Sequence, residues 1–117
     1  MIVTLAAFAM IAGGCGTIEV IPPGGQLTVA LTEYRLRPQD VEVSAGSLTI
    51  VAHNYGRQTH NVVILQHGRA QDSMQPIPPG ASGDMTVYLA PGRYVLASTV
   101  QSDQALGVYG TLVVRSG

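Results

Sequence analysis

Apolar and polar residues alternate in seven short stretches between residues 27 and 114; in the first of them, Leu27, Val29 and Leu31 occupy every second position. A period of two is typical of a strand that buries one face. We therefore predict strands over residues 27–33, 41–43, 47–53, 62–66, 85–90, 94–99 and 111–114. After residue 20, no stretch of ten residues has the 3.6-residue apolar period of a helix, so the pattern favours an all-β domain.

Turn-forming residues separate these stretches. Pro38 interrupts the segment 34–40, Ala45 and Gly46 predict a turn, and Pro91 and Gly92 precede the sixth strand. Residues 67–83 contain three prolines and are expected to form a long loop. About seven short strands at this spacing predict a Greek-key β-sandwich.

The first 26 residues differ from the rest in composition and lack the turn-separated strand pattern. Residues 1–14 are an uncharged, apolar run, shorter than the ~20 residues that a membrane-spanning helix needs. Its length fits the apolar core of a secretory signal, and the small residues before Cys15 resemble a bacterial lipoprotein box, in which the cysteine carries lipid. An ordinary signal peptide is the alternative. We expect a signal or lipoprotein segment over 1–15, a linker over 16–26 and one domain over 27–117.

Composition narrows the function further. The 117 residues suffice for one domain with a modest core. Because the net charge is only −1, the chain lacks the basic footprint of a protein that binds nucleic acid. Cys15 is the only cysteine, so no disulfide can form within the chain.

The end of the chain contains a recognisable motif, made of Tyr94, Ser98, Thr99, Val100, Gly107, Gly110, Thr111 and Leu112. The stretch resembles the C-terminal copper loop of the cupredoxins, the family of plastocyanin and azurin. In that family the loop reads Tyr, three residues, Cys-Thr-Val-Pro-Gly-His, three residues, and Gly-Met-x-Gly-Thr-Leu-Val-Val. The resemblance places Ser98 at the position of the cysteine ligand, Asp103 at that of a histidine ligand and Val108 at that of the axial methionine.

A second motif lies in the first half of the domain. Its matching residues are Thr32, Pro38, Val41, Val43, Ala45, Gly46, Val51 and Asn54, followed by the sequence His60-Asn-Val-Val-Ile. This pattern resembles the opening of small cupredoxin-like domains and places His60 at the first histidine ligand. The resemblance also implies that the Asn54 side chain ties the two ligand loops together, and that residues 67–83 cross between the two sheets.

The ligand positions determine the expected chemistry. A blue copper site needs two histidines and a thiolate, with a weak axial ligand. The hydroxyl of Ser98 is too hard and too weakly acidic to replace the thiolate, so we expect no type 1 copper and a hydrogen bond from Ser98 to nearby backbone instead. His60 is expected to be a partly exposed remnant that is hydrogen-bonded across the loop end. The alternative is a metal site of His60 and Asp103, with His53 or His67 as a third ligand.

Several other side chains are candidates for the site or its surroundings. By alternation, His53 should point outward and His67 should be solvated, while Met85 should enter the core and Met74 should lie in the long loop. Asp103 follows Ser102 in a sequence typical of a turn. The residue types of a serine triad are present in Ser98, His60 and Asp103, but the sequence shows no donor for an oxyanion hole. No other catalytic motif is present, so we do not expect an enzyme.

Two functions remain from the sequence. The first is an exported cupredoxin-like domain without type 1 copper or another cofactor, acting as a binding or accessory module for an unidentified protein partner. The alternative is a copper-binding or electron-transfer protein with an altered site that uses His60 and Asp103. In both cases we expect a periplasmic or extracellular location, with membrane attachment if Cys15 carries lipid, and no nucleic-acid partner.

Overall fold

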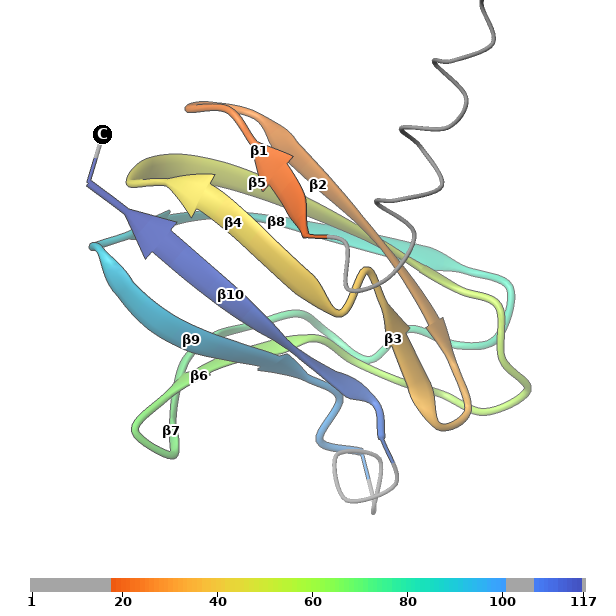
Figure 1. Cartoon of the computed structure of the whole chain (residues 1–117). Helices are drawn as coiled ribbons and strands as arrows, with labels where there is room; N and C mark the ends of the chain where they lie inside the picture. The colour runs from red at the N-terminus through yellow and green to blue at the C-terminus, as the bar shows by residue number, and fades with distance from the viewer. Residues whose placement is uncertain (1–17, 101–106, 117) are drawn as a thin grey trace, which may run out of the picture.

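The computed structural model describes residues 18–100 and 107–116, and these form ten strands in two sheets. The strands are β1 (Glu19–Ile21), β2 (Gln26–Thr32), β3 (Arg35–Arg37), β4 (Asp40–Ser44), β5 (Gly46–Asn54), β6 (Val63–Gln66), β7 (Arg69–Ser73), β8 (Ser82–Leu89), β9 (Gly92–Ala97) and β10 (Tyr109–Arg115). One sheet has the order β1-β4-β10-β9-β6-β7 and the other β3-β2-β5-β8. In Figure 1, β4, β10 and β9 lie in front of β5 and β8. The predicted all-β sandwich is confirmed.

The core lies between the sheets and follows the predicted alternation. Leu27, Val29 and Leu31 of β2 are fully buried, as are Leu96 of β9 and Leu112 of β10 from the facing sheet. Tyr94 also packs in this layer, and its hydroxyl donates a hydrogen bond of 2.7 Å to the carbonyl of Ala90. This bond fixes the turn between β8 and β9, which leads into the motif at the end of the chain.

Three of the ten strands were not predicted. β1 lies within the stretch expected to be a linker and pairs in parallel with β4; β3 lies within the turn expected over 34–40; and β7 lies within the loop expected over 67–83. Each is three to five residues long. Because β7 is exposed along its whole length, it has no apolar alternation that could have been detected. After β7, the chain crosses to the second sheet, as the resemblance implied.

Two methionine predictions have different outcomes. Met85 packs against the core as a partly buried residue, as expected. The expectation that Met74 lies in a loop omitted its burial: it is 6 % exposed and belongs to the core. Its backbone N–H donates to the carbonyl of Val62, which continues the antiparallel pairing of β6 and β7 beyond Val63 and Ser73.

No helix long and apolar enough to span a membrane occurs in residues 18–100 and 107–116. Cys15 and Asp103 lie outside the described residues, so the predictions for lipid attachment and for the second ligand position stay predictions.

Candidate functional site

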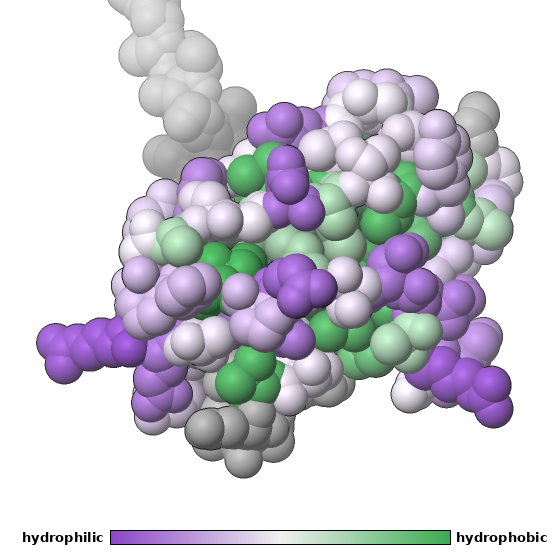
Figure 2. All heavy atoms as spheres, turned by 180° about the vertical axis from the view of Figure 1, so that it is seen from behind, coloured by the Kyte–Doolittle hydropathy of each residue, from purple (hydrophilic) through white to green (hydrophobic). Residues whose placement is uncertain are grey.

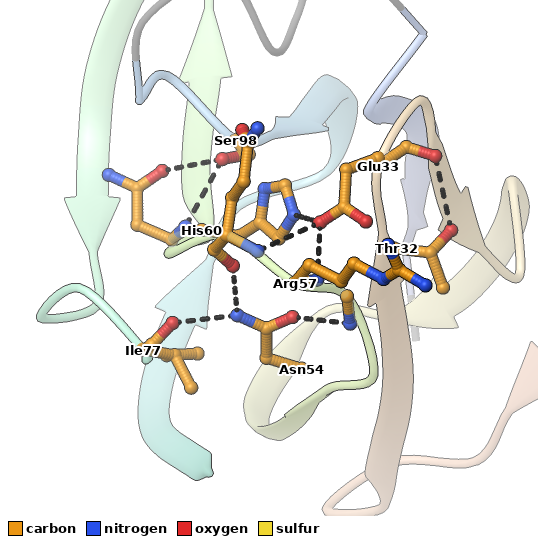
Figure 3. A network of polar contacts seen from close by, with 10 residues as sticks. Thr32, Glu33, Asn54, Arg57, His60, Ile77 and Ser98 are labelled. Carbon is orange, nitrogen blue, oxygen red and sulfur yellow. Dashed lines mark hydrogen bonds and ion pairs between the residues drawn. The ribbon is translucent and has the colours of Figure 1, made fainter. Parts of the chain in front are cut away.

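His60 lies at the end of the sandwich where the resemblance implied a ligand, and it is completely buried. The expectation that it would be partly exposed is therefore wrong. Its backbone is fixed by two hydrogen bonds with Ile77, from His60 N to Ile77 O (3.1 Å) and from Ile77 N to His60 O (2.7 Å). The imidazole Nε2 lies 3.1 Å from Oε2 of Glu33, as Figure 3 shows. This contact explains how a polar ring is accommodated without solvent.

Glu33 is the central acceptor of the site. Its Oε2 also accepts hydrogen bonds from the backbone N–H groups of Arg57 (2.7 Å) and Gln58 (3.0 Å). Desolvation raises the pKa of the Glu33 carboxyl, but the bonds from Gln58, His60 and Arg57 together outweigh it and hold that pKa below its usual range. Because an ionised carboxylate can only accept hydrogen bonds, the N–H group at Nε2 of His60 is the donor of this bond.

The role of Glu33 was not predicted from the sequence. Glu33 directly follows β2, and Arg57 and Gln58 follow β5. β2 and β5 pair in parallel, so their C-terminal ends lie at the same edge of the sheet. Only that parallel pairing, which the alternation pattern does not reveal, brings the carboxylate to the histidine.

Gly56 leaves room for this ion pair. A Cβ atom added at Gly56 would lie 2.9 Å from Cδ of Glu33 and 3.1 Å from Nε2 of His60. Distances this short mean that the carboxylate would have to move. The glycine of the N-x-G turn is therefore required by the space that Glu33 occupies.

Asn54 holds the loop between β5 and His60 in place. It is 1 % exposed, and its Nδ2 donates to the carbonyls of Gln58 and Ile77, both at 2.8 Å. Its Oδ1 accepts from Gly56 N at 2.8 Å. Asn54 thus joins its own loop to residue 77. The resemblance had assigned to Asn54 the bond between the two ligand loops, but among the described residues a different asparagine makes it.

That asparagine is Asn61. Its Oδ1 accepts hydrogen bonds from Thr99 N (2.8 Å) and from the Ser98 hydroxyl (3.2 Å), and its backbone N–H donates to Ser98 Oγ (3.1 Å). Nδ2 of Asn61 donates to the Thr99 hydroxyl at 3.2 Å. Ser98 is fully buried, and the predicted bond between its hydroxyl and the backbone is present, with the Asn61 N–H as the donor. Asn61 is adjacent to His60 in the sequence, which was the available signal for its role.

The axial position is apolar. Val108 is fully buried in the core, and its carbonyl accepts a hydrogen bond from Ser98 N at 3.0 Å. The side chain has no lone pair to offer a metal, so it only fills space. Ser98 and Val108, at the two ends of the loop, are therefore joined through the backbone.

The two remaining histidines do not join the site. His53 lies on the outer face of β5, where its Nδ1 is 2.6 Å from Ser82 Oγ, and His67 is exposed in the turn between β6 and β7. Both orientations agree with the prediction. Within residues 18–100 and 107–116, no group of three or more His, Cys, Asp or Glu side chains could hold a metal ion.

The described residues do not fit type 1 copper. The site offers one imidazole, a hydroxyl and an aliphatic side chain in place of two imidazoles, a thiolate and a thioether. The hydroxyl is already engaged with Asn61 as acceptor and donor. The hydrogen bonds of Asn61 with Ser98 and Thr99 can instead hold the loop after β5 and the loop after β9 together without a metal.

Comparisons with solved structures agree with this architecture. An auracyanin of Roseiflexus castenholzii, solved in a dithionite-reduced form, has a TM-score of 0.69 at 21 % identity, with 76 % of this chain and 95 % of that chain covered. Auracyanin A of Chloroflexus aurantiacus, a blue copper protein, has 0.68 at 20 % identity, covering 78 % and 100 %. Auracyanin B has 0.70 at 18 % identity, covering 76 % and 87 %.

No protein-family model and no curated protein matches the sequence. The structural likeness nevertheless spans most of both chains. The chain therefore has a cupredoxin-like fold, and at these identities the likeness concerns the fold alone.

Proposed function

We propose that the chain is an exported cupredoxin-like domain that carries no type 1 copper and acts as a binding or accessory module. The observation that supports this function is the state of Ser98: at the position of the thiolate, a buried hydroxyl is used in reciprocal hydrogen bonds with Asn61. The cross-link between the ligand loops is thereby made by protein groups. A module of this kind keeps the rigid end of the sandwich without needing a metal.

A second candidate is an altered metal site, and one contact favours it. Metal-ligating histidines commonly donate their other ring N–H to a carboxylate, which fixes the tautomer and the ring orientation. The bond from His60 Nε2 to Glu33 has this form. Such a site would combine His60 with harder ligands such as Asp103, and it would be an ordinary type 2 centre in place of a blue one.

Titration with Cu(II) distinguishes the two candidates. The full chain is used with Cys15→Ser, because a free thiol would itself bind copper. We expect no saturable binding by calorimetry and no intense blue absorption. One-to-one binding that is lost in His60→Ala, with the electron paramagnetic resonance spectrum of a type 2 centre, would refute the copper-free proposal and support the altered site.

A variant with restored ligands serves as the positive control for the copper titration. Ser98→Cys, Asp103→His and Val108→Met together restore the three ligand types that the resemblance implies are missing. If the loop retains the cupredoxin geometry, this variant should bind copper and develop the intense blue band. Failure of the variant to do so, while it remains folded, would mean that more than the ligand identities has changed.

Export and membrane attachment are proposed from Cys15 and the apolar run before it. The expected result is that the protein is recovered in the membrane fraction with a lipid mass on the peptide that contains Cys15. Recovery of an unmodified Cys15 peptide would contradict the lipoprotein assignment.

A further inference from the structure

Cationic and aromatic side chains gather on the outer face of the four-stranded sheet, at the end nearest Glu33. The register places Arg35 opposite Thr32, and Arg37 opposite Ala30, which in turn lies opposite His53. Tyr55 N bonds Leu31 O at 2.8 Å, so Tyr55 continues β5 beyond Asn54. We call this surface the arginine–tyrosine patch, and it consists of Arg35, Arg37, His53, Tyr55 and the small residues Ala30 and Thr32 between them.

The patch has large groups on two sides and small ones in the middle. The rings of His53 and Tyr55 are 6.0 Å apart between centroids, and Tyr55 is 68 % exposed. β3 and β5 flank β2 on either side, so the strands that carry the arginines and the rings lie about 10 Å apart. This separation leaves the width of one extended chain between them. Figure 2 shows polar and apolar residues interspersed on the side opposite to the view of Figure 1, with strongly hydrophilic side chains projecting at its margins.

The positive charge of the patch is not neutralised within the described part of the chain. Arg35 and Arg37 are exposed and make no ion pair with any described residue. The acid nearest to Arg35 in sequence is Glu33, whose carboxylate accepts from Arg57 N, Gln58 N and His60. The acid nearest to Arg37 is Asp40, which begins β4 in the other sheet and accepts a hydrogen bond from the Thr111 hydroxyl. Asp84 belongs to β8, where it pairs with Val51 of β5, and β8 lies on the far side of β5 from the arginines. The patch therefore attracts anions in a protein whose net charge is −1.

The spacing of the arginines indicates the form of the anion. Alternate residues of a strand lie about 6.6 Å apart on one face, and the same repeat applies to an extended partner. A guanidinium binds a carboxylate through two parallel hydrogen bonds. We propose that the arginine–tyrosine patch binds an extended acidic segment of a partner protein, with carboxylates at alternate positions. The proposal rests on the binding-module function and specifies its class of partner.

Fluorescence anisotropy of a labelled peptide of alternating Glu and Thr tests this, with the full chain at low salt. The variant Arg35→Gln with Arg37→Gln should weaken binding about tenfold or more. The control variant Arg69→Gln with Arg93→Gln removes two exposed arginines that lie outside the patch and should change affinity less than about twofold. Unchanged circular dichroism and Tm of both variants show that the fold is intact.

Several results would overturn the proposal. They are absence of peptide binding, equal weakening by the two arginine pairs, and equal affinity for a peptide of alternating Gln and Thr. Binding to phosphatidylglycerol vesicles that depends on Arg35 and Arg37, without peptide binding, would assign the patch to a membrane surface instead. The copper titration is independent of all these outcomes, so a failure here leaves the copper-free assignment to be judged on its own test.

Discussion

Replacing Asn54 tests whether protein hydrogen bonds organise the end of the sandwich. Asn54→Ala removes three bonds of 2.8 Å from a residue that is 1 % exposed. A buried hydrogen bond contributes about 1 kcal/mol net, so the substitution should lower the free energy of unfolding by about 3 kcal/mol. This is a large share of the 5–15 kcal/mol that is typical of a domain.

Urea unfolding measures this loss. With a slope of about 2 kcal/mol per M, the midpoint should fall by about 1.5 M while the slope stays the same. Gln58→Ala is the matched control, because only the backbone carbonyl of Gln58 accepts from Asn54. The control should stay within about 0.5 kcal/mol of the wild type.

Asn54→Asp adds a pH signature. The introduced carboxyl faces the carbonyls of Gln58 and Ile77, so it can donate only when protonated and its pKa is raised in the folded state. Its stabilising contribution is present below the pKa of the unfolded chain and is lost as the pH rises through the folded-state pKa. The variant should therefore be closer to the wild type at about pH 4 than at about pH 7. Equal midpoints for Asn54→Ala and Gln58→Ala, or a pH-independent Asn54→Asp, would refute the reasoning.

Other positions give shorter tests. The folded-state pKa of Glu33 is lowered, so its stabilising effect is present above the pKa of the unfolded chain and disappears as the pH falls through the folded-state value. In Glu33→Gln, the urea midpoint should therefore depend less on pH than in the wild type from about pH 5 downward. The same pH dependence in both proteins would contradict this. Gly56→Ala should lower Tm in a thermal melt, because its Cβ displaces the carboxylate, whereas a rise in Tm would show that the site tolerates the methyl group. Leu36→Ala, at a fully buried site, should cost about 2–4 kcal/mol in urea unfolding, against less than about 0.5 kcal/mol for Val20→Ala at 67 % exposure; similar losses would mean that β3 does not anchor the core.

The sequence by itself determined the class of the fold and the position of the candidate site. A period of two, interrupted by Gly and Pro, identified seven strands, because burying one face of a strand constrains every second residue. The motif spacing located His60, Ser98 and Val108 at one end of the domain, and the chemistry of Ser98 followed from its hydroxyl alone. These features are local, so they can be read from neighbouring positions.

The tertiary structure decided which groups meet there. Glu33 reaches His60 only because β2 and β5 run in parallel, and Asn61 takes the cross-linking role because its side chain, and not that of Asn54, faces Ser98 and Thr99. β7 has no buried face and is defined by its partner β6. Pairing between distant strands depends on contacts along the whole chain, whereas alternation depends on each strand alone. For this reason the pairing of Glu33 with His60 could not be derived from the sequence, and the adjacency of Asn61 to His60 was only a signal for its contact with Ser98.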